Sequence, residues 1–155
     1  MQAAVLAEAP TANWVVGAAA VADYRPVQRL SGKRRRDGDR WTLELEPNPD
    51  IIASVAAVAP GAVRVAFAAE SGEDLDYVRQ KAARKGVHAI AMNDVSQPGI
   101  GFESEFNALT LITPAGVETS GHLPKLGCAQ WLWARLLAHH HEGGLRAGLA
   151  REVED

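Results

Sequence analysis

The chain has 155 residues, of which 47% are hydrophobic and 23% are charged, and its formal net charge is -3 at pH 7. A chain of this length buries about 70% of the surface that its unfolded form exposes, which predicts one globular domain. The single cysteine, Cys128, excludes an internal disulfide and cysteine-rich zinc motifs, and it favours a reducing, cytoplasmic location. The negative net charge argues against nucleic acid as a partner. Because Glu8, Pro10 and Asn13 interrupt the apolar N-terminal segment, we expect neither a signal peptide nor a membrane span there.

Short apolar runs alternate with helix-like segments, which is typical of an α/β domain with a buried, mainly parallel sheet. The first run, residues 14–22, is unbroken and predicts a strand covered on both faces. Residues 41–47 alternate apolar and polar side chains, which predicts a strand with one buried face. Two further buried strands are predicted at residues 63–70 and 87–94.

The segment after residue 47 carries the signals of a helix start. Asn48 is the predicted N-cap, with Pro49 at the first helical position and Asp50 in the first turn. The Pro-Gly pair at residues 60–61 ends this helix.

A second helix is predicted from a capping box formed by Ser71 and Asp74, and it continues to about Lys85 before Gly86 ends it. The segment 107–120 predicts a hairpin at the sheet edge.

The last predicted helix spans residues 125–140. We expect residues 1–141 to form the domain and residues 142–155 to form a flexible tail.

Three predicted strands end in polar or small residues: Asp23, the segment from Phe67 to Glu70, and the pair Asn93 and Asp94. In open α/β sheets, ligands bind in the crevice beyond the carboxyl ends of the strands. The sequence therefore predicts that the functional residues converge on one edge of the sheet.

A dense group of cations, Lys33 to Arg36 with Arg29 and Arg40 beside it, stands out in this acidic chain. Such a run is compatible with a local anion site. Composition alone favours a plainer interpretation, in which the run is a solvated loop or a charged guard against edge pairing of the next strand.

Several motifs occur in a fixed order: AAVADYRP, GKRRR, WTLELEPNPDI, VAFAAE, QKAARK, AMNDVSQPGIGF and NALTLIT. Together they resemble phosphopantothenate–cysteine ligase over about residues 10–138. In bacteria this family is usually the C-terminal half of a bifunctional protein whose other half is a flavin-dependent decarboxylase.

The resemblance implies a three-layer, Rossmann-like fold with a mainly parallel sheet and a β-hairpin or extended strand used for dimerisation. It also implies a CTP-dependent step of coenzyme A biosynthesis, in which 4'-phosphopantothenate is activated as an acyl-cytidylate and L-cysteine then displaces CMP. Magnesium and a homodimer are expected, whereas no flavin, nucleic acid or membrane partner is expected for this part.

The resemblance also assigns roles to single residues. Lys33 matches a catalytic, phosphate-contacting lysine, although the family's usually apolar next position is the cation Arg34 here. The positions that match nucleotide-contacting residues are Ala18, Ala19, Asp23, Lys33, Pro49, Asp50, Ile51, Ile52, Phe67, Lys81 and Lys85. Asn93 and Asp94 are expected at the edge of the site, and the sequence indicates no metal ligands.

Each assignment has a plainer structural alternative. Asp23 could cap a turn, Asp50 could only complement the helix dipole, and Phe67 could be plain core. Lys81 and Lys85 lie four residues apart, a spacing that surface lysines often have.

The glycine-rich strand and turn with which the family's domain begins have no counterpart in these 155 residues. We therefore expect weak or no ligase activity from this chain alone. The alternative function is a non-catalytic module for nucleotide binding and dimerisation.

Overall fold

The computed structural model describes residues 1–36, 38–70, 72, 74–96, 99–100, 104–145 and 148–149. Its central sheet has five strands in the order β1-β4-β5-β6-β7. The first three are parallel, and β6 and β7 run antiparallel to their neighbours. The carboxyl ends of β1, β4 and β5 therefore lie at the same edge. The strands are β1 (Trp14–Gly17), β4 (Val63–Glu70), β5 (Ala89–Asp94), β6 (Phe106–Thr113) and β7 (Gly116–Pro124).

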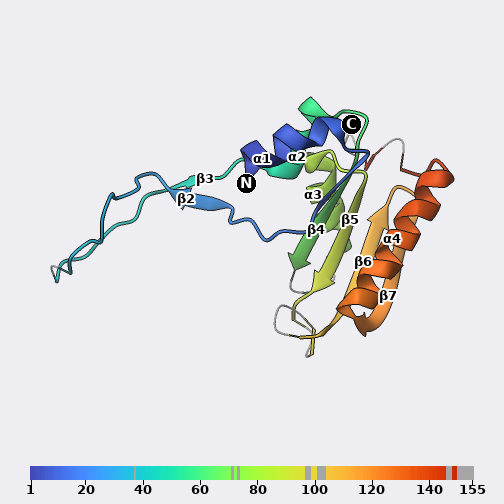
Figure 1. The fold of residues 1–155 in the computed structure, drawn as a ribbon. Coiled ribbons are helices and arrows are strands. Elements are labelled where there is room, and N and C mark those ends of the chain that lie inside the picture. The colour runs from blue at the N-terminus through green and yellow to red at the C-terminus, as the bar shows by residue number, and fades with distance from the viewer. Residues whose placement is uncertain are drawn as a thin grey trace, which may run out of the picture.

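Helices cover both faces of this sheet, which confirms the predicted three-layer α/β fold (Figure 1). One face carries α1, α2 and α3, and the other carries α4. The bounds are α1 (Gln2–Glu8), a 3-10 turn η1 (Ala9–Thr11), α2 (Ile51–Val58), α3 (Leu75–Lys85) and α4 (Lys125–His141). The sequence predicts α2, α3 and α4 but gives no signal for α1.

The alternation of side chains along β4 explains how one strand serves two cores. Val63 and Val65 point into the cluster that includes Leu136 of α4. Ala66 and Ala68 point to the opposite face, into the cluster that holds α3. Because successive residues of a strand face opposite sides, a run apolar at every position is what a doubly covered strand requires.

The start of α2 differs from the prediction. Asp50 is the N-cap, since its Oδ1 accepts a hydrogen bond of 3.1 Å from the Ala53 amide, and Pro49 lies before the helix. Asn48 does not cap α2, because its carboxamide donates to the Ala22 carbonyl instead.

The ends of α3 agree better with the sequence. Asp74 is the N-cap and accepts from the Tyr77 amide at 2.9 Å, while the predicted partner Ser71 lies outside the described residues. Gly86 ends the helix at φ +63°, a left-handed conformation that glycine adopts without strain.

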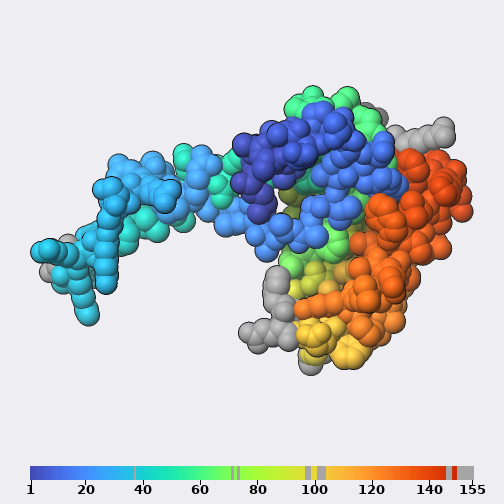
Figure 2. Space-filling view, viewed as in Figure 1, coloured from blue at the N-terminus to red at the C-terminus, as the bar shows by residue number. Residues whose placement is uncertain are grey.

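The segment between β1 and α2 projects from the body as a long arm (Figures 1 and 2). At its base, β2 (Tyr24–Pro26) pairs antiparallel with β3 (Leu45–Pro47). The predicted strands at 14–22 and 41–47 are therefore wrong beyond Gly17 and before Leu45. Every described residue from 18 to 45 is exposed, so this segment lacks the covering layer that a buried strand requires.

The first part of the predicted loose tail is packed. Leu145 is 1% exposed and belongs to the core cluster on the α4 side of the sheet. The Leu149 amide donates to the Val87 carbonyl at 3.1 Å. The prediction of a flexible tail is thus wrong at Leu145, and residues 146, 147 and 150–155 lie outside the described part.

Within the described ranges, no helix has both the length and the apolar character needed to cross a bilayer.

Candidate functional site

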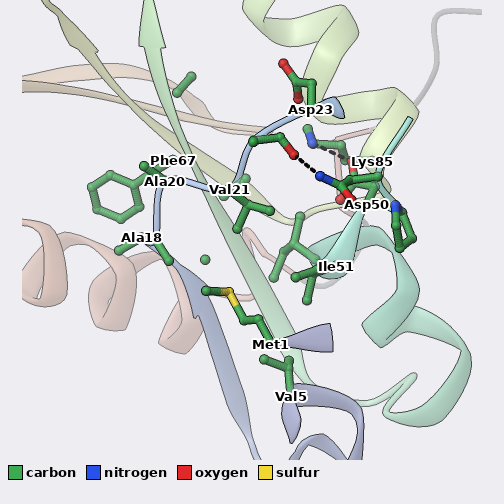
Figure 3. Close-up of a pocket in the computed structure, with 18 of the residues that line it drawn as sticks. Met1, Val5, Ala18, Ala20, Val21, Asp23, Asp50, Ile51, Phe67 and Lys85 are labelled. Atoms are coloured by element: carbon green, nitrogen blue, oxygen red, sulfur yellow. Dashed lines mark hydrogen bonds and ion pairs between the residues drawn. The ribbon is translucent and has the colours of Figure 1, made fainter. Parts of the chain in front are cut away.

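A cleft of about 670 Å³ opens where the carboxyl ends of β1 and β4 meet the start of α2 (Figure 3). The loop that follows β1, residues 18–23, forms one wall. The side of α3 that carries Lys81 and Lys85 forms another. This is the position in which open α/β sheets bind ligands.

The cleft collects ten of the eleven predicted nucleotide-binding positions, which come from four separate segments of the chain. They are Ala18, Ala19, Asp23, Pro49, Asp50, Ile51, Ile52, Phe67, Lys81 and Lys85. The predicted convergence at one sheet edge is therefore present in the fold.

The two acids and two lysines of the cleft are arranged in part as pairs. The Lys85 ammonium contacts the Asp50 carboxylate, which links α3 to the start of α2 (Figure 3). The Lys81 Nζ lies 2.7 Å from Oε1 of Glu70, the last residue of β4. Both lysines are about one quarter exposed, so solvent and a ligand can reach them.

Among the side chains that line the cleft, Asp23 and Asp50 balance the charges of Lys81 and Lys85, and Glu70 adds a further carboxylate beside Lys81. A nucleoside triphosphate carries several negative charges. Its binding therefore needs further cations, supplied by a metal ion or by another part of the protein.

The remaining wall is apolar. Met1 and Val5 from the N-terminal segment, Ile51 from α2 and Phe67 from β4 surround the hollow (Figure 3). An apolar wall beside a few placed polar groups is typical of small-molecule sites. The sequence does not predict the roles of Met1 and Val5, because their contribution depends on α1, whose short apolar run gives no helix signal.

Lys33 is not among the residues that line the cleft, since it lies on the arm, which extends away from the body (Figure 1). The arm has a hollow of its own, about 450 Å³, lined by residues that include Val27, Leu30, Trp41 and Leu43. The structure thus separates Lys33 from the other predicted nucleotide-binding residues of the same chain.

The predicted edge residues Asn93 and Asp94 end β5 and are partly buried, but they do not line the cleft. Asp94 Oδ1 accepts from the Gly72 amide at 3.1 Å and from the Ser96 amide at 2.9 Å. In the described structure this carboxylate holds two neighbouring loops together.

In the described part of the chain, no cluster of three or more His, Cys, Asp or Glu side chains could hold a metal ion by itself. A magnesium ion that arrives with a triphosphate needs only one or two protein carboxylates, because phosphate oxygens and waters complete its shell. Asp23 fits this requirement, since it is one of the residues that line the cleft and its carboxylate has no hydrogen bond or ion pair to a described residue.

The comparisons with known proteins agree with one another. Residues 1–139 match the protein family described as DNA/pantothenate metabolism flavoprotein C-terminal domain. The chain is 45% identical over 119 residues to the coenzyme A biosynthesis bifunctional protein CoaBC of Vibrio cholerae, and 43% identical over 120 residues to that of Escherichia coli. Each of these matches covers 75% of the chain.

Among solved structures, the chain is similar to the C-terminal domain of a coenzyme A biosynthesis bifunctional protein CoaBC, with a TM-score of 0.70 and 25% identity. That match covers 91% of this chain and 63% of the other. The matched part is about 30% of the length of the two curated relatives.

Proposed function

This chain belongs to the family of the DNA/pantothenate metabolism flavoprotein C-terminal domain, and from this premise we propose that it binds CTP for the ligase step of coenzyme A biosynthesis. The observation that carries the proposal is the assembly of ten separately predicted residues around one cleft. Local sequence patterns do not bring four distant segments together, so the convergence supports a common ligand.

The proposed reaction has two steps. A carboxylate oxygen of 4'-phosphopantothenate attacks the α-phosphorus of CTP, and pyrophosphate leaves to give the acyl-cytidylate. The amine of L-cysteine then attacks the acyl carbon, CMP leaves, and the amine loses a proton. Steps of this kind depend on positioning and on neutralising the charge that develops on the phosphates.

In this scheme the apolar wall and the backbone of Ala18 and Ala19 surround the nucleoside. Lys81 and Lys85 contact the phosphates, and Asp23 provides a carboxylate to the magnesium ion that accompanies the triphosphate. The first turn of α2 also offers free backbone amides near Ile51 and Ile52 for a polar edge or an anion.

We further propose a homodimer formed through the arm. Large apolar side chains on the arm are exposed to solvent, among them Trp41 at 59% and Leu30 at 54%. Apolar side chains gathered on a projecting segment are typical of an interaction surface. In this dimer, Lys33 reaches the cleft of the second copy and supplies the positive charge that the cleft of one chain lacks.

The experiment that tests the binding proposal is titration calorimetry of the chain with CTP and with ATP in the presence of magnesium. Lys33→Ala is measured beside the unmodified chain, and this variant should bind the triphosphate more weakly. Absence of CTP binding would refute the proposal. Light scattering at micromolar concentration tests the arm, and a monomeric mass would contradict the dimer.

The alternative is a module that binds the nucleotide and dimerises without catalysing the ligation. The separation of Lys33 from the cleft of its own chain favours this reading. Pyrophosphate release with CTP, 4'-phosphopantothenate, L-cysteine and magnesium separates the two functions. At the pH and salt concentration of cytoplasm, we expect the isolated chain to release little or no pyrophosphate. Turnover comparable to that of a complete ligase would contradict this expectation.

A further inference from the structure

The loop that forms one wall of the cleft, residues 18–23, is held by very few contacts. Each of its residues is exposed, and four of them are alanines, whose side chains have little surface to bury. Such a wall cannot be held in place by packing alone. Its position must therefore depend on hydrogen bonds.

Within the described structure, both hydrogen bonds that hold this loop come from one residue, Asn48. The Asn48 Nδ2 donates to the Ala22 carbonyl at 2.7 Å, and the Asn48 backbone amide donates to the Asp23 carbonyl at 2.7 Å. Asn48 is 26 residues away from Ala22 in the sequence, at the junction of β3 and α2.

Asn48 is itself fixed from two directions. The following residue, Pro49, restricts the backbone of Asn48 to extended conformations. The Arg25 Nη1 donates to the Asn48 Oδ1 at 3.2 Å, so the carboxamide oxygen and nitrogen each have a partner. Arg25 is held in turn by Glu46, its partner in the β2–β3 pairing, with Nε donating to Oε1 at 2.8 Å.

We propose that Asn48 is a positioning residue of the nucleotide site. By holding the Ala22 and Asp23 carbonyls, it keeps the loop against the cleft and keeps Asp23 among the lining residues. Because Arg25 lies at the base of the arm, the same carboxamide links the direction of the arm to the shape of the cleft. This inference rests on the proposed nucleotide binding.

The test variant is Asn48→Asp. It has almost the same size and keeps the acceptor for Arg25, but it replaces the donor to Ala22 by an oxygen that faces the Ala22 carbonyl. The matched control is Asn13→Asp, which makes the same chemical change at an exposed position outside the cleft, where the asparagine side chain has no partner among the described residues.

The first measurement needs no ligand. Hydrogen exchange of the residue-48 amide, which donates to the Asp23 carbonyl, and of the Val27 amide, which donates to the Glu44 carbonyl, should become several-fold faster in Asn48→Asp, because loss of the Nδ2 donor to Ala22 loosens the loop. The control should exchange like the unmodified chain. Equal exchange rates in Asn48→Asp and the unmodified chain would overturn the role of Asn48, whether or not CTP binds.

The second measurement is the Kd for CTP with magnesium. A misplaced wall should weaken binding about tenfold in Asn48→Asp, which corresponds to roughly one charge-assisted hydrogen bond. In an Asp23→Ala background the same change should weaken binding by less than about threefold, since the group that Asn48 positions is then absent.

The outcomes separate the two claims. If the unmodified chain does not bind CTP, the proposed function fails and this inference falls with it. If the unmodified chain binds CTP but Asn48→Asp binds equally well, or if the two changes are fully additive, the proposed function stands and the positioning role is overturned.

Discussion

The Lys85 ammonium on α3 is hydrogen-bonded to the Asp50 carboxylate, which also caps the first turn of α2. One carboxylate therefore joins two helices at the floor of the cleft. Lys85 and Asp50 are each partly exposed, so the ion pair is screened by water and contributes at most about 1 kcal/mol to stability. The helix cap adds a separate contribution of about the same size.

Two substitutions of Asp50 separate these contributions. Asp50→Asn keeps an oxygen for the Ala53 amide and loses the charge, whereas Asp50→Ala loses both. We expect the free energy of unfolding in urea to fall by about 1 kcal/mol more in Asp50→Ala than in Asp50→Asn. Asp76→Asn, on the exposed side of α3, is the control and should change little. Equal losses in both Asp50 variants would show that the cap contributes nothing.

In the proposed site, Glu70 would compete with the phosphates of CTP for Lys81. Its carboxylate lies 2.7 Å from the Lys81 Nζ, and neither side chain is more than about 30% exposed. Glu70→Gln should therefore strengthen CTP binding by about threefold, because Lys81 then has no ion pair with a carboxylate to break before it contacts a phosphate. Lys81→Ala should weaken binding, while Glu142→Gln beyond the end of α4 should have no effect. Weaker CTP binding in Glu70→Gln would contradict this reading and would make Glu70 a supporting partner of Lys81.

A pH dependence of stability is expected from His88, which precedes β5. Burial lowers the pKa of His88 below its usual value near 6.5, and the neighbouring Arg64 guanidinium lowers the pKa further. The neutral ring accepts a hydrogen bond of 3.0 Å from the Arg64 amide. Because the unfolded chain takes up the proton first, stability is complete above about pH 6.5 and declines as the pH falls through the lower pKa of the folded state.

Thermal unfolding of His88→Asn tests this expectation. The asparagine oxygen can accept from the same amide but does not titrate. The difference in Tm between the unmodified chain and the variant should therefore change between pH 7.5 and pH 5.5, in the direction that favours the variant at the lower pH. Parallel curves over that range would assign the acid sensitivity to other groups.

The core beneath α4 should respond to truncation as a close-packed interior does. Leu136 is 1% exposed, whereas Leu126 on the same helix is 70% exposed. Leu136→Ala should lower the free energy of unfolding by about 2–5 kcal/mol through lost burial and the cavity left behind. Leu126→Ala should cost much less, and a comparable loss at both positions would show that α4 is packed differently.

Much of the fold was predictable because its signals are local. The buried strand at 63–70 reads as an apolar run and is β4, and the left-handed Gly86 marks the end of α3. The failures came where local patterns have more than one outcome. The apolar run at 14–22 predicts a strand, yet pairing with β4 stops at Gly17 and Ala66, and residues 18–22 are exposed in the loop that follows.

The chemistry of the site was largely predictable, but its geometry was not. The matched motifs identified ten residues that the cleft contains. No sequence signal showed that Lys33 lies on an arm away from them, or that Met1 and Val5 complete the wall. Those facts depend on where a projecting segment and a short helix pack relative to the sheet.

The sequence by itself determined the α/β class, the strands and helices that face the core, and the residue types available for binding a polyanion, because periodicity and helix signals act over a few neighbouring residues. Only the tertiary structure decided that Asn48 holds a loop 26 residues away instead of capping α2, and that the cations of the arm stand apart from the cleft. Both outcomes depend on contacts, or on the lack of contacts, between residues that are far apart in the sequence, and local patterns carry no information about these.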